Sequence, residues 1–104
     1  MGIMTGITRD EAKMFVGVGW SGLVDEVYDR LPSTARVSQV KEKLGRIRIY
    51  VFCVPIKTLD FLDDIERRSG EICEHCGKVG KAVTIRGWIK TLCEGCTETW
   101  KKEE

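Results

Sequence analysis

Two pairs of cysteines in the last third of the chain have a spacing that suits metal binding. Cys73 and Cys76 form one Cys-x-x-Cys pair, and Cys93 and Cys96 form a second pair after sixteen intervening residues. Two such pairs supply a complete tetrahedral set of thiolates for one zinc ion. Two disulfides, or four unrelated buried thiols, are the alternatives, but random burial does not produce the x-x spacing at both ends.

Four thiolate ligands leave a zinc ion no open position for water or substrate. Catalytic zinc sites keep such a position, whereas structural sites do not. We therefore expect one structural Zn²⁺ ion with Cys73, Cys76, Cys93 and Cys96 as its ligands. The sequence contains no Ser-His-Asp or Cys-His arrangement, no P-loop and no His-Glu-x-x-His motif. We accordingly expect no enzymatic activity and assign no catalytic residue.

The residues around the cysteines predict a knuckle, a hairpin and a helix in that order. Gly77 follows the first pair, as a tight knuckle turn requires, and short strands at 83–85 and 88–92 flank a turn at Arg86-Gly87. The segment 94–102 has the pattern of a helix. This order resembles a treble-clef zinc finger, and the resemblance implies that the N-terminus of the helix stabilises the charge of the thiolates.

Two helices are predicted in the first third of the chain. Thr8 and Glu11 can form a capping box at the start of the first helix, which extends to Val16. The second helix is expected from Ser21 to Leu31, where Pro32 ends it, and its apolar face carries Leu23, Val24, Val27, Tyr28 and Leu31.

The middle of the chain predicts strands and then a third helix. Apolar residues alternate from Arg46 to Val54, with Ile47, Ile49, Val51 and Cys53 on one side of a strand. Its expected partner is 37–43, through a turn at Leu44-Gly45, although that segment also matches a helical stripe. A helix over 59–69, capped by Thr58 and ended by Gly70, would bury Leu59, Leu62 and Ile65.

Composition indicates one soluble domain over residues 1–104, and the predicted helices and strands make its fold class α+β. The chain has 104 residues, of which 42% are hydrophobic, and a domain of this size gains much from a metal ion. N-terminal helices and a β-hairpin in residues 1–70 are expected to pack against a treble-clef-like zinc finger in residues 71–104 and to share its core. No apolar run approaches the roughly 20 residues of a membrane span, and Met1–Met4 does not resemble a signal peptide. We therefore expect a cytoplasmic protein with reduced thiols.

The basic residues are concentrated in the middle of the chain. Residues 36–57 carry six basic groups and one acidic group, whereas the flanking segments 1–35 and 58–72 are acidic in balance. This basic band could contact phosphates, and its residues are Arg36, Lys41, Lys43, Arg46, Arg48 and Lys57. Solvated charges on strands explain the band equally well.

Three segments of the chain resemble a group of small uncharacterised proteins that bacteriophages and prophages carry. They are Gln39 to Gly45 with Arg48 and Tyr50, then Cys73 to Gly80, then Gly87 to Cys93, and the similarity covers about residues 20–97. Members of that group often have a histidine as the last ligand, where this chain has Cys96, and both residue types fit a tetrahedral site. The resemblance implies a bacterial host cell, where small phage proteins such as anti-CRISPR inhibitors often block a defence nuclease.

Three further features have simpler explanations than a functional site. Gly17, Gly19 and Gly22 match the dinucleotide-binding fingerprint, but a helix precedes them where a strand is required, so we attribute the match to chance. His75, the only histidine, is expected to be a solvated turn residue, with competition for the metal as the alternative. Cys53 lies on the apolar face of a strand and is expected to be a buried thiol.

These observations favour a zinc-stabilised interaction protein that binds a protein partner. The partner would be a host defence nuclease such as a type II CRISPR effector, blocked sterically or by the acidic helix faces. Trp20, Trp88 and Trp100 could anchor an interface, with Trp100 the most exposed. The alternative is a nucleic-acid-binding zinc module that uses the basic band and Lys78, Lys81, Arg86 and Lys90. A folding module without a partner is the third option.

Overall fold

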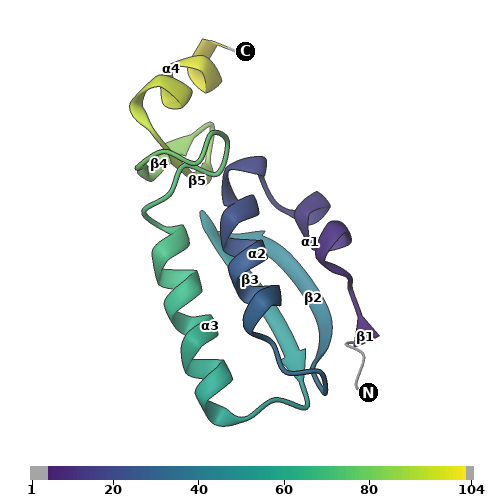
Figure 1. Cartoon of the computed structure of the whole chain (residues 1–104). Helices are drawn as coiled ribbons and strands as arrows, with labels where there is room; N and C mark the ends of the chain where they lie inside the picture. The colour runs from purple at the N-terminus through teal and green to yellow at the C-terminus, as the bar shows by residue number, and fades with distance from the viewer. Residues whose placement is uncertain (1–4, 103–104) are drawn as a thin grey trace.

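A small sheet covered by two helices forms the larger part of the molecule, and a hairpin with a terminal helix forms the rest (Figure 1). We describe residues 5–102 of a computed structural model. The elements are β1 (Thr5–Gly6), α1 (Arg9–Phe15), the short 3₁₀ helix η1 (Val18–Trp20), α2 (Ser21–Arg30), β2 (Arg36–Lys43), β3 (Arg46–Phe52), α3 (Ile56–Ser69), β4 (Lys81–Ile85), β5 (Trp88–Leu92) and α4 (Glu94–Lys102). The chain is therefore α+β, as the sequence predicts.

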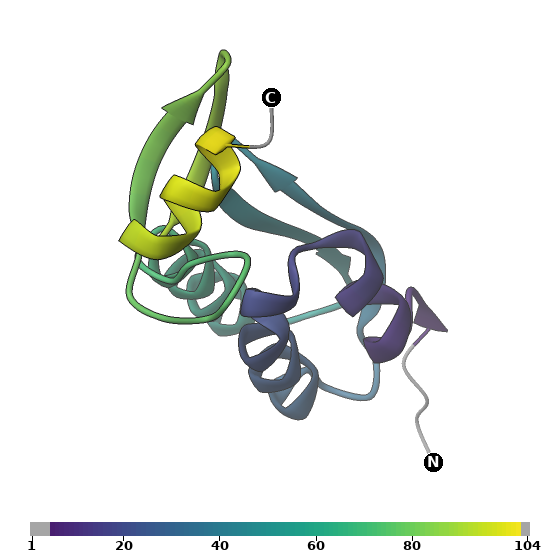
Figure 2. The same cartoon turned by 90° about the horizontal axis from the view of Figure 1, so that it is seen from above.

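The molecule is elongated, with extents of 49 × 22 × 22 Å. The first sheet has the order β1-β2-β3, in which β1 pairs parallel to β2 and β3 pairs antiparallel to it. The second sheet is the β4-β5 hairpin. Figure 2 shows α4 lying across this hairpin, at the end of the molecule away from β1.

The segment 37–43 is a strand, which settles the alternative that the sequence left open. Lys43 pairs with Arg46 across a two-residue turn. Leu44 has φ +54° and Gly45 has φ +80°, and positive φ at both central residues is the geometry that matches the twist of a hairpin. The β4-β5 hairpin closes in the same way, at Arg86 and Gly87, as predicted.

The two N-terminal helices follow the prediction closely. The Thr8 hydroxyl accepts the Glu11 N–H at 3.2 Å, and the Glu11 carboxylate accepts the Thr8 N–H at 2.9 Å, so the capping box is present. Helix α1 ends at Phe15 and α2 ends at Arg30, each one residue before the predicted end. The buried face of α2 includes Leu23, Val24, Val27 and Tyr28.

Helix α3 begins earlier than predicted, and its buried face differs as a result. Pro55 is the N-cap, so the prediction of Thr58 as the cap was wrong, and Thr58 is a buried residue of the first turn. Leu59 is exposed, whereas Leu62 and Ile65 are buried as predicted. Ser69 completes the buried line, because its hydroxyl accepts the Ile47 N–H of β3 at 2.9 Å. Gly70 has φ −70°, so it ends the helix without the expected left-handed conformation.

The prediction that Cys53 is a buried thiol was wrong. Cys53 is exposed and has φ +62°. Strand β3 ends at Phe52, and the left-handed conformation of the next residue turns the chain away from the sheet before the alternation reaches Cys53. Trp100 is half-buried, whereas Trp88 is the exposed tryptophan and Trp20 is fully buried.

The buried apolar residues form two clusters, and hydrogen bonds connect the two parts of the chain that carry them. The larger cluster lies between the sheet, α2 and α3, and the smaller one contains Cys73, Ile85 and Leu92. The Trp20 indole N–H donates to the Ile72 carbonyl at 2.8 Å. The Thr91 hydroxyl donates to the Gly45 carbonyl at the tip of the β2-β3 hairpin.

Two glycines of the fingerprint-like motif, Gly17 and Gly19, have a structural role in the contact with residues 73 and 74. The Gly19 N–H donates to the Glu74 carbonyl at 2.8 Å. A Cβ atom on Gly19 would lie 2.0 Å from the Cys73 carbonyl oxygen, and one on Gly17 would lie 2.1 Å from the Glu74 carbonyl oxygen. Only glycine permits this approach of two backbone segments. The turn at residues 73–78, which we call the knuckle, is therefore docked directly on the η1 segment.

No helix within residues 5–102 is long and apolar enough to cross a membrane. Met1–Met4, where the sequence predicts no signal peptide, lie outside the described residues.

We expect Gly19→Ala to destabilise the chain, because its Cβ would overlap the backbone of the knuckle. The loss should be about 1–3 kcal/mol, as for other overpacked sites. Gly22→Ala is the matched control from the same motif. A Cβ at Gly22 meets nothing within 4 Å, and alanine is favoured over glycine in a helix by about 0.5–1 kcal/mol. Thermal unfolding followed by circular dichroism should show opposite shifts, and an unchanged Gly19→Ala would contradict the docking.

Candidate metal centre

The four cysteines of the two Cys-x-x-Cys pairs lie together in space. The Sγ atoms of Cys73, Cys76, Cys93 and Cys96 are all within 4.8 Å of one another, so these residues could bind one metal ion. Two come from the knuckle that follows α3, one from the residue between β5 and α4, and one from the first turn of α4. No bond joins any two of these sulfurs, so the alternative of two disulfides does not describe this structure.

Backbone hydrogen bonds shape the knuckle that carries the first pair. The Cys73 N–H donates to the Lys78 carbonyl at 2.7 Å, and the Gly77 N–H donates to the Cys73 carbonyl at 2.9 Å. Gly77 has φ +84°, which a side chain would strain. The turn requires this residue to be glycine, as the sequence predicts, and it directs both cysteine side chains to the same side.

The start of α4 positions the second pair. The Thr97 N–H and hydroxyl both donate to the Cys93 carbonyl, at 2.9 Å and 2.8 Å. The Cys96 N–H points at the Cys93 sulfur, 3.4 Å away. Backbone N–H groups at a helix N-terminus favour negative charge, so this geometry suits a thiolate at Cys93.

The four thiols differ in acidity because their surroundings differ. Burial acts to raise the pKa of Cys73, but backbone hydrogen bonds from Cys93, Cys76 and His75 outweigh it and lower this pKa to about 6. A hydrogen bond from the Cys96 backbone also lowers the pKa of Cys93. Burial and the neighbouring sulfurs raise the pKa of Cys96 to about 12. Metal binding deprotonates the thiols, and the charge of a bound cation would offset the crowded negative charge of four sulfurs.

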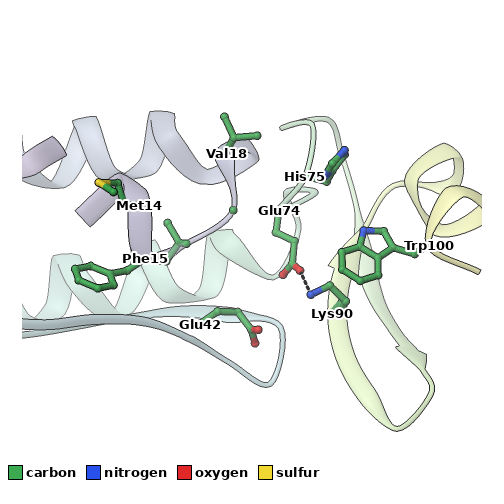
Figure 3. Close-up of a pocket in the computed structure, with 10 residues that line it drawn as sticks. Met14, Phe15, Val18, Glu42, Glu74, His75, Lys90 and Trp100 are labelled. Atoms are coloured by element: carbon green, nitrogen blue, oxygen red, sulfur yellow. Dashed lines mark ion pairs between the residues drawn. The ribbon is translucent and has the colours of Figure 1, made fainter. Parts of the chain in front are cut away.

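An ion pair that the sequence analysis missed lies beside the cluster. The Glu74 carboxylate, from within the knuckle, contacts the Lys90 ammonium of β5 at 2.6 Å, and both side chains are largely buried (Figure 3). The Lys90 nitrogen also lies 4.5 Å from the centre of the Trp100 ring. No local spacing in the sequence predicts this ion pair, because Glu74 and Lys90 meet only when the knuckle folds against the hairpin.

His75 is exposed and lies outside the four-sulfur cluster. It borders a hollow between the knuckle and α1, together with Glu74 and Trp100 (Figure 3). The arrangement agrees with a turn residue and does not place its imidazole in the ligand set.

No protein-family model, no curated protein and no solved structure matches the chain.

We expect Cys76→Ser to lose the bound metal, because a hydroxyl is a poor replacement for one of four thiolate ligands. Native mass spectrometry of the wild-type chain should show one zinc ion, whereas Cys76→Ser should have the metal-free mass. Cys53→Ser is the matched control, since Cys53 is exposed and lies outside the cluster. His75→Ala should also keep the metal. A folded but metal-free wild-type chain, or loss of zinc from His75→Ala, would overturn this ligand assignment.

Proposed function

We propose that the chain is a protein-interaction module stabilised by one structural zinc ion. Zinc–sulfur bonds of about 2.3 Å place the sulfurs of a tetrahedral site about 3.8 Å apart. Cys76 and Cys93 have their sulfurs 3.5 Å apart, and all four lie within 4.8 Å. The small cluster around Cys73 holds few apolar residues, so a metal ion supplies the stability that this part lacks. The knuckle, hairpin and helix of this part follow one another in the order of a treble-clef zinc finger.

One observation carries the proposal of protein binding: apolar side chains are exposed on both sides of the junction between the two parts. Met14, Phe15 and Val18 are 83%, 57% and 69% exposed at the end of α1 and the start of η1. Trp88 is 73% exposed on the hairpin. Scattered apolar residues are ordinary on a surface, but a group that contains aromatic residues beside hollows is typical of protein interfaces.

The partner that we propose is a host defence nuclease such as a type II CRISPR effector. The resemblance to phage-borne proteins is the support for this choice. Steric cover by the exposed apolar group is the favoured mechanism. The acidic face of α2 contributes less, because Asp25 pairs with Lys13 at 2.8 Å and with Arg9 at 2.9 Å, and Glu26 binds Arg68 in two hydrogen bonds.

The nuclease proposal predicts inhibition that depends on the exposed apolar group. Adding the purified chain to a type II CRISPR effector with guide RNA should reduce cleavage of target DNA. Phe15→Ser should weaken this inhibition roughly tenfold or more, since an aromatic anchor at the centre of an interface contributes about 2 kcal/mol or more. Ile56→Ser is the matched control, because Ile56 is an even more exposed apolar residue but lies at the start of α3. Full cleavage at saturating concentrations of the chain would refute this target.

Nucleic-acid binding is the second candidate, and one feature of the sheet favours it. Lys41 lies opposite Arg48, and Lys43 lies opposite Arg46, in the β2-β3 register. Like charges in directly opposed positions destabilise a hairpin, and a phosphate backbone would relieve the repulsion. However, Arg48 pairs with Glu66 at 3.2 Å, and Lys90 of the finger is occupied by Glu74.

Salt dependence separates the two candidates. A chain that binds DNA through its basic band should lose affinity steeply between low and moderate salt, because bound counterions are released on binding. Lys43→Gln should then reduce the steepness. We expect no such binding to duplex or single-stranded DNA in an electrophoretic mobility assay. A steep salt dependence that is reduced in Lys43→Gln would favour the second candidate.

A further inference from the structure

A hollow of about 280 Å³ lies where the end of α1, the knuckle and β5 meet. Figure 3 shows its two sides: Phe15 and Val18 come from the N-terminal segment, whereas Glu74, Lys90 and Trp100 come from the finger. Glu42 of β2 lies along a third side. The hollow exists only when the two parts of the chain are docked, and we call it the junction hollow.

The charged groups that line the junction hollow do not balance. Two carboxylates, Glu42 and Glu74, face one ammonium group, that of Lys90. The Glu74 side chain is 9% exposed, and Lys90 occupies only one of its carboxylate oxygens. The other oxygen, Oε2, is buried and has no hydrogen-bond partner among the described residues. A buried carboxylate oxygen without a donor is costly, so this position favours a ligand that brings one.

Apart from the exposed His75, the remaining walls are mostly apolar and suit the stem of a long side chain. Met14, Phe15 and Val18 form the outer rim, where they are exposed. Trp100 lies further in, with the Lys90 nitrogen near its ring. Small-molecule sites usually measure about 300–1,000 Å³. The junction hollow, at about 280 Å³, is below that range and suits one side chain better than a whole small ligand.

Among cationic side chains, arginine fits these walls best. A guanidinium is planar, can donate two parallel hydrogen bonds to a carboxylate, and stacks on aromatic rings. Its apolar stem can lie along Phe15 and Val18 while its head neutralises the excess negative charge. A lysine head is a more strongly hydrated point charge and has no planar surface to stack.

We propose that the junction hollow receives an arginine side chain from the partner protein, with Glu42 and Glu74 as the acceptors and Phe15 as the apolar contact. The proposal rests on the proposed function, because it identifies the surface feature of the partner that a protein-interaction module would recognise. An arginine-rich face of the partner would be covered when this side chain is bound.

The test uses N-acetyl-L-arginine amide as the probe and N-acetyl-L-citrulline amide as its neutral, nearly isosteric control. Titration of the full zinc-loaded chain is followed by two-dimensional ¹⁵N–¹H NMR. The arginine probe should shift the amide signals of Phe15 and Glu74 and the indole signal of Trp100. The citrulline probe should leave them in place, because it offers hydrogen-bond donors without the positive charge. Equal shifts with both probes, or none with the arginine probe, would overturn the proposal.

Two matched variants localise the effect. Glu42→Gln removes one negative charge but keeps an oxygen that can accept the Gly45 N–H, which Glu42 accepts at 2.9 Å. Its affinity for the arginine probe should fall roughly tenfold, as expected for a lost hydrogen bond to a charged group. Asp60→Asn makes the same change of charge on the exposed surface of α3 and should bind as the wild type does. Equal affinities of the two variants would contradict the proposed acceptor.

The result of the arginine test can be distinguished from the result of the test of the proposed function. If the arginine probe binds at the junction hollow but the chain does not inhibit the nuclease, the arginine site is supported and the proposed target is refuted. If the chain inhibits the nuclease and Glu42→Gln inhibits it equally well, the proposed target is supported and the arginine site is refuted.

Discussion

The contact between η1 and the knuckle is the constraint on which the remaining architecture depends. A single backbone hydrogen bond, from Gly19 to the Glu74 carbonyl at 2.8 Å, joins segments that are 55 positions apart in the chain. The absence of side chains at Gly17 and Gly19 lets the backbones approach this closely. The contact fixes where the knuckle lies, and thereby sets the position of the Cys73 and Cys76 sulfurs and of Glu74 in the wall of the junction hollow.

Stability is divided unequally between the two parts of the chain. The sheet and its helices bury a cluster that includes Trp20, Val24 and Ile47, whereas the finger buries little beyond Cys73, Ile85 and Leu92. Zinc bound to such a site contributes on the order of 10–16 kcal/mol, comparable with the whole stability of a typical domain, about 5–15 kcal/mol. A metal ion bound by the four cysteines would therefore substitute for an apolar core in the finger. The hydrogen bonds of Trp20 and Thr91 connect the finger to the rest of the molecule.

The sequence predicted most elements because their signals are local. The capping box at Thr8, the turn at Leu44-Gly45 and the grouping of the four cysteines all depend on short spacings, and the structure contains them. The predictions were wrong or incomplete where a contact between residues far apart in the sequence determines the structure. Ser69 bonds to β3 and completes the buried face of α3. Gly17 and Gly19 are explained only by the contact with a knuckle more than fifty residues away. The Glu74–Lys90 pair likewise has no signature in the linear order.

The two cysteines of the knuckle differ sharply in accessibility, and this has a kinetic consequence. Cys73 has no exposed surface, whereas Cys76, three residues later, is open to solvent. A chelator or an oxidant therefore approaches the sulfurs from one direction and meets Cys76 first. Dissociation of the ion would be ordered, and a partly released state would keep Cys73 and its docked turn in place.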